Sequence, residues 1–245
     1  MSELNNYSGI HQLLDSEVSF LNYRKWITNK IIKSAEKYSH TKPKKVLEFG
    51  AGTGSLSEIY FSITNTKPIC LEIDSKLQQL IVQKNLTVRS SISEIREKNE
   101  IYDLVFTSNV LEHIENDLHS LLEIRTILKK NGLLIIYVPA HQWLFSDLDK
   151  EVGHYRRYSK KILEETIINA NYKILRTEYA DSLGILASVI IKIFGYKNNL
   201  NIGGKTSMRL YDLIFHPISK FIDFITFRKF VGNNLYLVAQ KENTK

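Results

Sequence analysis

Cysteine, proline and long apolar runs are scarce in this sequence. Its 245 residues include one cysteine, Cys70, so an intrachain disulfide framework and a cysteine-based zinc site are both excluded. The 4 prolines and 11 glycines, together with 43% hydrophobic residues, exclude a collagen-like, disordered or low-complexity chain. The longest apolar run near the C-terminus, Leu183 to Ile191, is too short to span a bilayer. The first residues lack the basic and apolar regions of a secretory signal, and we therefore expect a reduced, cytoplasmic protein.

Basic residues outnumber acidic residues, and the excess is concentrated near the C-terminus. The formal net charge is +7. Residues 182–230 contribute +5 of it, from seven Lys or Arg and two Asp, and they are also rich in Ile and Phe. Such a segment can contact anionic lipid or a phosphorylated substrate, or it can serve only solubility. The chain has no RNA-binding motif and its basic residues are otherwise spread out, so we do not expect nucleic acid as a partner.

Strand-like and helix-like patterns alternate through the middle of the chain. Apolar runs predict seven strands, at residues 45–50, 68–73, 86–89, 102–107, 133–138, 172–179 and 234–239. Helical spacing is found between them, at residues 75–84, 117–130 and 159–169. Asn131-Gly132 is expected to end the second of these helices, and Ser159 to cap the third. The alternation predicts an α/β fold with a doubly wound parallel sheet.

Two further helical segments are expected within a single domain of residues 1–245. Residues 1–40 are predicted to form an N-terminal helical cap with one helix over 17–38, and residues 182–230 a helical insertion between the last two strands. The insertion has an apolar stripe at helical spacing, formed by Leu210, Leu213, Ile214, Ile218, Phe221, Phe224 and Ile225. Such a stripe usually packs on the core, and we favour burial of Leu210, Ile214, Phe221 and Ile225. The basic residues leave open a lid or a helix on a membrane surface.

A glycine-rich turn follows the first predicted strand and opens a helix. It reads Glu48-Phe-Gly50-Ala-Gly52-Thr-Gly54. Glycines let the backbone turn tightly and approach a ligand, and the helix N-terminus that follows offers unpaired N–H groups. The spacing departs from the dinucleotide fingerprint at Ser55, and no G-K-S/T motif is present to form a P-loop.

An acidic residue lies about 20 residues beyond the glycines. In nucleotide-binding folds, an acid at this spacing binds the ribose hydroxyls. Glu72 ends the second strand, where its carboxylate can accept hydrogen bonds from both ribose hydroxyls. Asp74 is the competing candidate, and either acid could instead serve the N-terminus of the helix over 75–84. The turn and the acid together predict a nucleoside-containing ligand at the carboxyl ends of the strands.

These motifs in combination are similar to those of a known family. VLEFGAGTG, LEID, YDLVFTSNVLEHI, LKKNG and LLIIYVPA resemble the motifs of class I S-adenosylmethionine-dependent methyltransferases, from residue 45 to near residue 180. The resemblance implies a Rossmann-like sheet of seven strands with the last one antiparallel, and S-adenosylmethionine as the cofactor. It also implies that Glu72 binds the ribose, that the backbone of Gly50, Ala51 and Gly52 approaches the methionine part, and that Glu48 holds the ammonium group indirectly.

The predicted cofactor site contains one departure from the family. The family commonly has an acid after the third strand that contacts the adenine amino group, and Ser91 occupies that place here. The Ser91 hydroxyl or the Ile92 N–H could bond the adenine edge instead. The full predicted set is Glu48, Gly50, Ala51, Gly52, Gly54, Glu72, Ile73, Ser91, Ile92, Asn109 and Val110.

The segment after the fifth strand carries the candidate catalytic and acceptor-binding residues. Its VPAHQW and GHYRRYS motifs are similar to those of a subgroup often associated with glycan and cell-surface metabolism. His141 and His154 are the candidate bases. Tyr155, Arg156 and Arg157 are candidates for acceptor binding, with the arginines clamping a phosphate or carboxylate. The opposing interpretation, of equal weight, is a structural loop that ties the next helix to the sheet.

The dipeptide Glu112-His113 poses the question of a metal. Methyltransferases of this fold that act on RNA ends or quinone precursors carry E-x-x-E-H at this place and bind a divalent metal. Asn109 replaces the first acid here, so Glu112, His113 and the distant His154 would form only a partial site. We interpret the dipeptide as a loop-to-helix feature and predict no metal.

The predicted activity is methyl transfer from S-adenosylmethionine to an oxygen or nitrogen of a small-molecule, glycan-type or lipid-linked acceptor. The enzyme would align nucleophile and methyl group, and would remove a proton where the nucleophile is a hydroxyl. An RNA methyltransferase and an NAD-dependent oxidoreductase are the alternatives, and Ser55 disfavours the second. A peripheral contact with an anionic membrane is left open.

Overall fold

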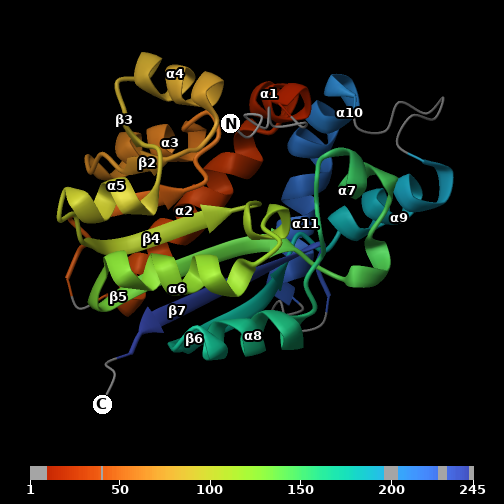
Figure 1. The fold of residues 1–245 in the computed structure, drawn as a ribbon. Coiled ribbons are helices and arrows are strands. Elements are labelled where there is room, and N and C mark those ends of the chain that lie inside the picture. The colour runs from red at the N-terminus through yellow and green to blue at the C-terminus, as the bar shows by residue number, and fades with distance from the viewer. Residues whose placement is uncertain (1–9, 40, 196–203, 226–230, 243–245) are drawn as a thin grey trace.

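Seven strands form one mixed sheet in the computed structural model, which describes residues 10–39, 41–195, 204–225 and 231–242 (Figure 1). The strands are β1 (Val46–Phe49), β2 (Ile69–Leu71), β3 (Thr87–Arg89), β4 (Tyr102–Ser108), β5 (Leu128–Pro139), β6 (Tyr172–Ala180) and β7 (Asn234–Lys241). Their order is β3-β2-β1-β4-β5-β7-β6, and β7 runs antiparallel to both of its neighbours. The predicted doubly wound sheet with an antiparallel last strand is confirmed.

Helices cover both faces of the sheet. They are α1 (Ile10–Ser19), α2 (Leu21–Tyr38), α3 (Ser55–Thr64), α4 (Ser75–Gln83), α5 (Ile92–Glu97), α6 (Asp117–Ile127), α7 (Asp147–Glu151), α8 (Lys160–Asn169), α9 (Gly184–Phe194), α10 (Lys205–Leu210) and α11 (His216–Ile225). Shorter turns are η1 (Leu111–His113), η2 (Gln142–Leu144) and the π-helical η3 (Tyr211–Phe215). Along β4, Val105 packs in the core under α5, α6 and α8, whereas Leu104 and Phe106 pack in the core under α2 and α3. Because both faces are buried, the central strands are apolar throughout.

The N-terminal segment differs from the prediction of one helix over 17–38. The helix is interrupted at Phe20, which separates α1 from α2. The N–H groups of Asn22 and Tyr23 at the start of α2 donate to the carboxylate of Asp212 at 2.9 and 2.8 Å. This capping group belongs to the distant insertion, so the local sequence carries no signal for the break.

The helix predicted over 117–130 ends at Ile127. Leu128 already belongs to β5 and pairs with Tyr102, after which the register between β4 and β5 shifts. Asn131 adopts a left-handed φ of 59° just beyond. Helical spacing continues through residues 128–130, but pairing with β4 overrides it.

The helical insertion between β6 and β7 is confirmed, but the predicted packing of its apolar stripe is wrong. The four residues expected in the core are instead between 48% and 63% exposed: Leu210, Ile214, Phe221 and Ile225. The residues that α11 buries are polar: His216, Ser219 and Asp223. In Figure 1, β4 points toward the side of the molecule where α7, α9 and α11 lie. Among the described residues, no helix is long and apolar enough to cross a bilayer.

Candidate active site

The turn between β1 and α3 requires glycine for its shape. Gly50 and Gly52 have φ angles of 70° and 56°, in the left-handed region that favours glycine. A Cβ at Gly50 would lie 2.5 Å from the side chain of Val110, so any larger residue would collide there. The N–H groups of Gly50 and Ala51 donate to the carbonyl of Leu71 at 2.9 and 3.0 Å. The turn is therefore fixed to β2 and presents main chain rather than side chain to a ligand.

Glu48 is a buried carboxyl group that holds the first turn of α3. It accepts a hydrogen bond from the N–H of Ser57 at 3.0 Å and another from the Ser57 hydroxyl. Burial raises the pKa of Glu48 to about 8, against the opposing effect of these two bonds. This arrangement gives Glu48 a structural role, and its indirect contact with the cofactor ammonium stays a prediction.

The two competing acids after β2 have different roles. Glu72 is 7% exposed and accepts the N–H of Gly52 at 2.7 Å, which joins it directly to the glycine turn. It also accepts the N–H groups of Ile73 and Asp74, while burial raises its pKa. Asp74 instead caps α4, accepting the N–H groups of residues 76 and 77 at 2.8 and 3.1 Å. Glu72 is thus the acid placed at the turn, as the sequence indicated.

This donor set fits S-adenosylmethionine. The glycine turn offers main chain that no Cβ covers, and one carboxylate lies against it. A carboxylate has roughly four acceptor sites, and Glu72 uses three of them on main-chain N–H groups. The geometry leaves acceptor capacity for a ribose hydroxyl.

The remaining predicted cofactor residues surround the same edge of the sheet. Ser91 caps α5 by accepting the N–H of Glu94 at 3.1 Å, so its hydroxyl oxygen is already engaged. Asn109 is exposed with a left-handed φ of 54°, and its N–H donates to Tyr137. Ile73 is 79% exposed, so only its main chain is held at the site. For Ser91 the adenine contact stays a prediction, and it would use the second acceptor site or the proton of the hydroxyl.

Sequence reasoning missed two residues of the N-terminal helices that reach the turn. The Leu13 side chain of α1 would be 3.3 Å from a Cβ placed at Gly52. Arg24 of α2 donates from Nη1 to the Ser55 hydroxyl at 3.3 Å, at the N-terminus of α3. The helical cap therefore covers the glycine turn. No local motif marks either residue, because their place depends on how α1 and α2 pack.

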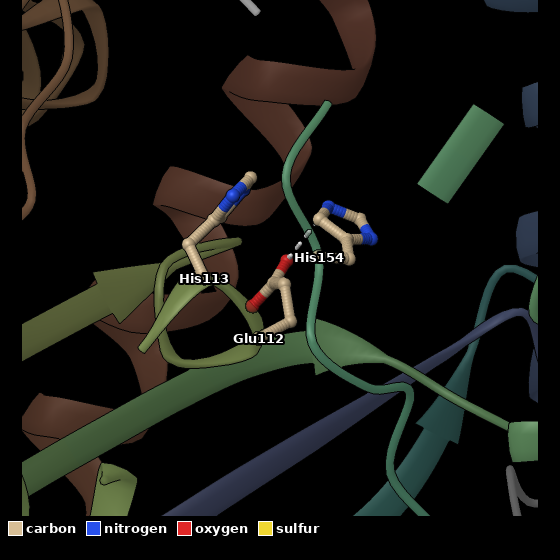
Figure 2. A group of neighbouring side chains, drawn as sticks. All are labelled: Glu112, His113 and His154. Atoms are coloured by element: carbon tan, nitrogen blue, oxygen red, sulfur yellow. Dashed lines mark ion pairs between the residues drawn. The ribbon is translucent and has the colours of Figure 1, made fainter. Parts of the chain in front are cut away.

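A cluster of the buried Glu112 and the half-buried His113 and His154 is the main feature of the predicted catalytic region (Figure 2). One ligand atom from each of the three residues lies within 4.8 Å of the others. Glu112 is fully buried, and neither of its carboxylate oxygens accepts a hydrogen bond of normal geometry from any described residue. Burial raises the pKa of Glu112 to about 8. The structure thus brings together the three residues that the sequence interpretation treated as a partial metal site.

His154 is oriented by neighbours on its own loop. Its Nδ1 lies 2.8 Å from the carboxylate of Asp149, which also accepts from Nε of Arg157 at 2.8 Å. Burial alone would raise the pKa of Asp149, but these two partners hold it well below its usual range. The Nε2 of His154 points to Glu112, 3.9 Å from Oε1. Burial, together with the nearby His154, lowers the pKa of His113 to about 4, so His113 is neutral at neutral pH.

The other candidates of this loop have different environments. His141 stacks on Tyr179 with ring centroids 5.2 Å apart, and it has no contact with the cluster among those the structure describes. Arg156 pairs with Asp117 at 2.9 Å, and the buried Arg157 serves Asp149. These ion pairs support the structural interpretation of the loop for both arginines. Tyr155 is 54% exposed, and its role in acceptor binding stays a prediction.

Comparison with known proteins agrees with this geometry. A family model described as a methyltransferase domain matches residues 23–177. An uncharacterised protein of Methanocaldococcus jannaschii is 35% identical over 104 residues, covering 42% of this chain and 44% of that protein. The chain thus matches less than half the length of this relative.

Solved structures share the fold at low identity. A methyltransferase from Archaeoglobus fulgidus gives a TM-score of 0.56 at 14% identity, covering 89% of this chain and 94% of the other. A structure of the Trm112 methyltransferase activator of Haloferax volcanii in complex with a methyltransferase gives a TM-score of 0.62 at 14% identity. The match covers 98% of this chain and 99% of the other. Phosphoethanolamine N-methyltransferase 2 of Haemonchus contortus, in complex with S-adenosyl-L-methionine, gives a TM-score of 0.59 at 16% identity. The match covers 99% of this chain and 61% of the other. Because the family model matches more than half of the chain, this protein belongs to the methyltransferase domain family, as a class I S-adenosylmethionine-dependent enzyme.

Proposed function

We propose that the enzyme methylates a hydroxyl oxygen of a lipid-linked acceptor at the surface of an anionic membrane. The observation that carries the proposal is the reversed polarity of the insertion, whose helices bury polar residues and expose apolar ones. α9 buries Gly184 and Ser188, and α11 buries His216, Ser219 and Asp223. Helices of a soluble core have the opposite arrangement.

Polar side chains anchor the insertion to the rest of the protein. Asp223 accepts the N–H groups of Asp181 and Ser182 at 2.8 and 3.0 Å, at the end of β6. The hydroxyl of Ser219 accepts the N–H of Leu183 at 3.1 Å. Asp212 caps α2 from the other side of the insertion. These buried bonds fix which face of the helices is turned outward.

The outward face is apolar and basic. Its exposed apolar side chains are Leu186, Ile190, Ile193, Phe194, Leu210, Leu213, Ile214, Phe215, Ile218, Phe221, Phe224 and Ile225. Such an accumulation of exposed apolar side chains is typical of an interaction site. The two acids of this segment, Asp212 and Asp223, are buried. Lys192, Lys205 and Arg209 are exposed, and Lys205 also pairs with Asp15. An apolar face bordered by cations is the pattern of a helix lying in an anionic bilayer surface.

Membrane contact on this side would bring a lipid-linked acceptor to the catalytic end of the sheet. S-adenosylmethionine supplies an electrophilic methyl group, and the protein must align an acceptor oxygen with it. As that oxygen attacks, the Nε2 of His154 is the group we expect to take the hydroxyl proton, with Asp149 holding the ring through Nδ1. Asp149 acts here as a positioning residue, not a catalytic one.

Vesicle co-sedimentation tests the membrane part. The protein should bind vesicles of phosphatidylglycerol and phosphatidylcholine at low salt, bind pure phosphatidylcholine more weakly, and lose the difference at 1 M salt, where the Debye length is roughly 3 Å. Burying one phenylalanine is worth roughly 1.5–3 kcal/mol, so Phe221→Ser with Phe224→Ser should weaken binding by at least roughly 100-fold.

An exposed apolar residue elsewhere provides the matched control. Ile168 on α8 is 59% exposed, and Ile168→Ser should leave vesicle binding unchanged. No binding to either vesicle, or equal losses in the double variant and in Ile168→Ser, would remove the membrane from the proposal. The face would then have to cover a protein partner, and the acceptor would be a soluble small molecule or RNA.

A further inference from the structure

We propose that Asp212 of the insertion is a positioning residue for the cofactor site, on which it acts by holding the N-terminus of α2. Asp212 lies in the π-helical turn η3, far along the chain from the helical cap that covers the glycine turn. The insertion and the cofactor site are thereby coupled, so that a change in the insertion alters the affinity for the cofactor.

The carboxylate of Asp212 is committed to the start of α2. The residue is 2% exposed, and its two oxygens accept the N–H groups of Asn22 at 2.9 Å and Tyr23 at 2.8 Å. The first N–H groups of a helix have no partner inside the helix, and the side chain at the N-cap usually supplies one. Here Phe20 stands at the N-cap, and its side chain cannot accept a hydrogen bond. Asp212 therefore replaces a local N-cap from 190 residues away.

Further contacts fix the joint between α1 and α2 to the insertion. The ring of Phe20 stands edge-on to that of Tyr211, with centroids 6.2 Å apart. The ring of Tyr23 packs on His216 of α11, with centroids 4.8 Å apart. The Tyr211 hydroxyl donates to the buried carboxylate of Asp181, just after β6. The position of η3 therefore determines where α2 begins.

The conformation of η3 is a second, independent observation. π-Helical turns are rare and are found frequently at functional sites. This turn joins α10 to α11, and it buries Asp212 while Leu213, Ile214 and Phe215 are exposed. One turn of five residues thus contributes both to the outward apolar face and to the contact with the helical cap.

The helical cap transmits this contact to the glycine turn. Arg24, on the first turn of α2, donates from Nη1 to the Ser55 hydroxyl at 3.3 Å. Leu13 of α1 reaches within 3.3 Å of a Cβ placed at Gly52. In addition, α1 packs beside α10 of the insertion (Figure 1). Because the cofactor has to lie against the glycine turn, the stability of this cap arrangement contributes to the free energy of cofactor binding.

The coupling gives membrane contact an effect on the cofactor site. Contact of the apolar face with an anionic membrane would order the insertion, and would thereby stabilise the helical cap over the glycine turn. By reciprocity, a bound cofactor would strengthen membrane binding by the same factor. This regulatory effect rests on the proposed function, whereas the control of cofactor affinity by Asp212 does not.

Calorimetric titration of the full chain with S-adenosylhomocysteine tests the role of Asp212. Loss of an N-cap corresponds to a change of roughly 2–30-fold in an equilibrium constant, so Asp212→Ala should raise the Kd by a factor in this range. Asp212→Asn keeps one of the two acceptors and should have a smaller effect. Ser159 caps α8 by accepting the N–H of Ile162 at 3.2 Å and is the matched control. Ser159→Ala should lower the melting temperature and leave the Kd unchanged.

Hydrogen exchange gives a measurement that a purely structural role of Asp212 would not change. In the wild type, S-adenosylhomocysteine should slow exchange of the main-chain N–H groups of η3 as well as those of the glycine turn. In Asp212→Ala the slowing should be confined to the glycine turn. Vesicles containing phosphatidylglycerol should lower the Kd for S-adenosylhomocysteine in the wild type and not in Asp212→Ala.

An unchanged Kd in folded Asp212→Ala would overturn the proposal, as would equal changes in Asp212→Ala and Ser159→Ala. Absence of slower exchange in η3 of the liganded wild type would also overturn it. If Asp212→Ala does not fold, Asp212→Asn takes its place in each comparison. The titrations and the exchange experiment need no membrane and no methyl acceptor, so their failure leaves the proposed function standing. A failure of the vesicle measurements alone removes the regulatory effect and leaves the role of Asp212.

Discussion

The different roles of Glu72 and Asp74 give a prediction that can be worked out quantitatively. Glu72→Gln keeps the shape of the side chain but removes its charge and one acceptor. A hydrogen bond to a charged group contributes roughly 1.5–3 kcal/mol, so the Kd for S-adenosylhomocysteine should rise by roughly 10–150-fold. The fold should survive with reduced stability, because the amide oxygen can accept either from Gly52 or from Ile73 and Asp74, while the NH2 group faces the other donors.

Asp74→Ala should lower the stability of the protein and leave its affinity for S-adenosylhomocysteine unchanged. Its carboxylate caps α4 through two main-chain N–H groups, and losing an N-cap costs roughly 0.5–2 kcal/mol. For a chain of this size, 1 kcal/mol lowers the melting temperature by roughly 2–4 °C. Its Kd for S-adenosylhomocysteine should stay near that of wild type.

Calorimetry for Kd and differential scanning calorimetry for stability measure both effects on the same samples. Equal losses of affinity in Glu72→Gln and Asp74→Ala, with both folded, would refute the assignment of Glu72 to the ribose. A stability loss in Asp74→Ala smaller than the error would refute its assignment as a cap.

Three further predictions test other parts of the site. Glu48→Gln should flatten the pH dependence of stability, as urea titrations at pH 5 and pH 8 would show. Between the unfolded pKa near 4.5 and the folded pKa of about 8, Glu48 of the wild type releases its proton only on unfolding. The unfolding free energy of the wild type therefore falls with rising pH by up to roughly 1.4 kcal/mol per pH unit in this range. Gly50→Ala should destabilise by at least roughly 1–3 kcal/mol, because φ is 70° and the new Cβ meets Val110; an unchanged melting temperature would contradict this. Arg156→Ala should lower the melting temperature, whereas His154→Ala should lower turnover without changing S-adenosylhomocysteine affinity; the reverse pattern would exchange their roles.

The sequence predicted the parts of the fold that local patterns determine. The continuous apolar strands follow from burial on both faces, and the glycine turn with Glu72 follows from backbone geometry and spacing. The structure places Glu72, and not Asp74, against the glycine turn, because Asp74 caps α4; the ribose contact of Glu72 stays a prediction.

Long-range contacts decide the features that the sequence did not predict. The break at Phe20 depends on Asp212, and the start of β5 at Leu128 depends on pairing with Tyr102. Helical periodicity identifies an amphipathic helix but not the direction of its apolar face. In α11 that direction is set by Asp223, which binds main chain at residues 181 and 182. The convergence of His154 with Glu112 likewise needs the tertiary fold.

Transfer of a radiolabelled methyl group from S-adenosylmethionine into a membrane fraction is the decisive measurement for a lipid-linked acceptor. Incubation with the enzyme, followed by separation of lipid, water-soluble, RNA and protein fractions, identifies the class of acceptor even when its structure is unknown. We predict label in the organic-solvent extract, as a methyl ether of a lipid-linked hydroxyl. We also predict a strong decrease with the Phe221→Ser and Phe224→Ser double variant, whose side chains are 63% and 73% exposed in the wild type. Label confined to the RNA or the water-soluble fraction, unchanged by the double variant, would contradict the proposed activity.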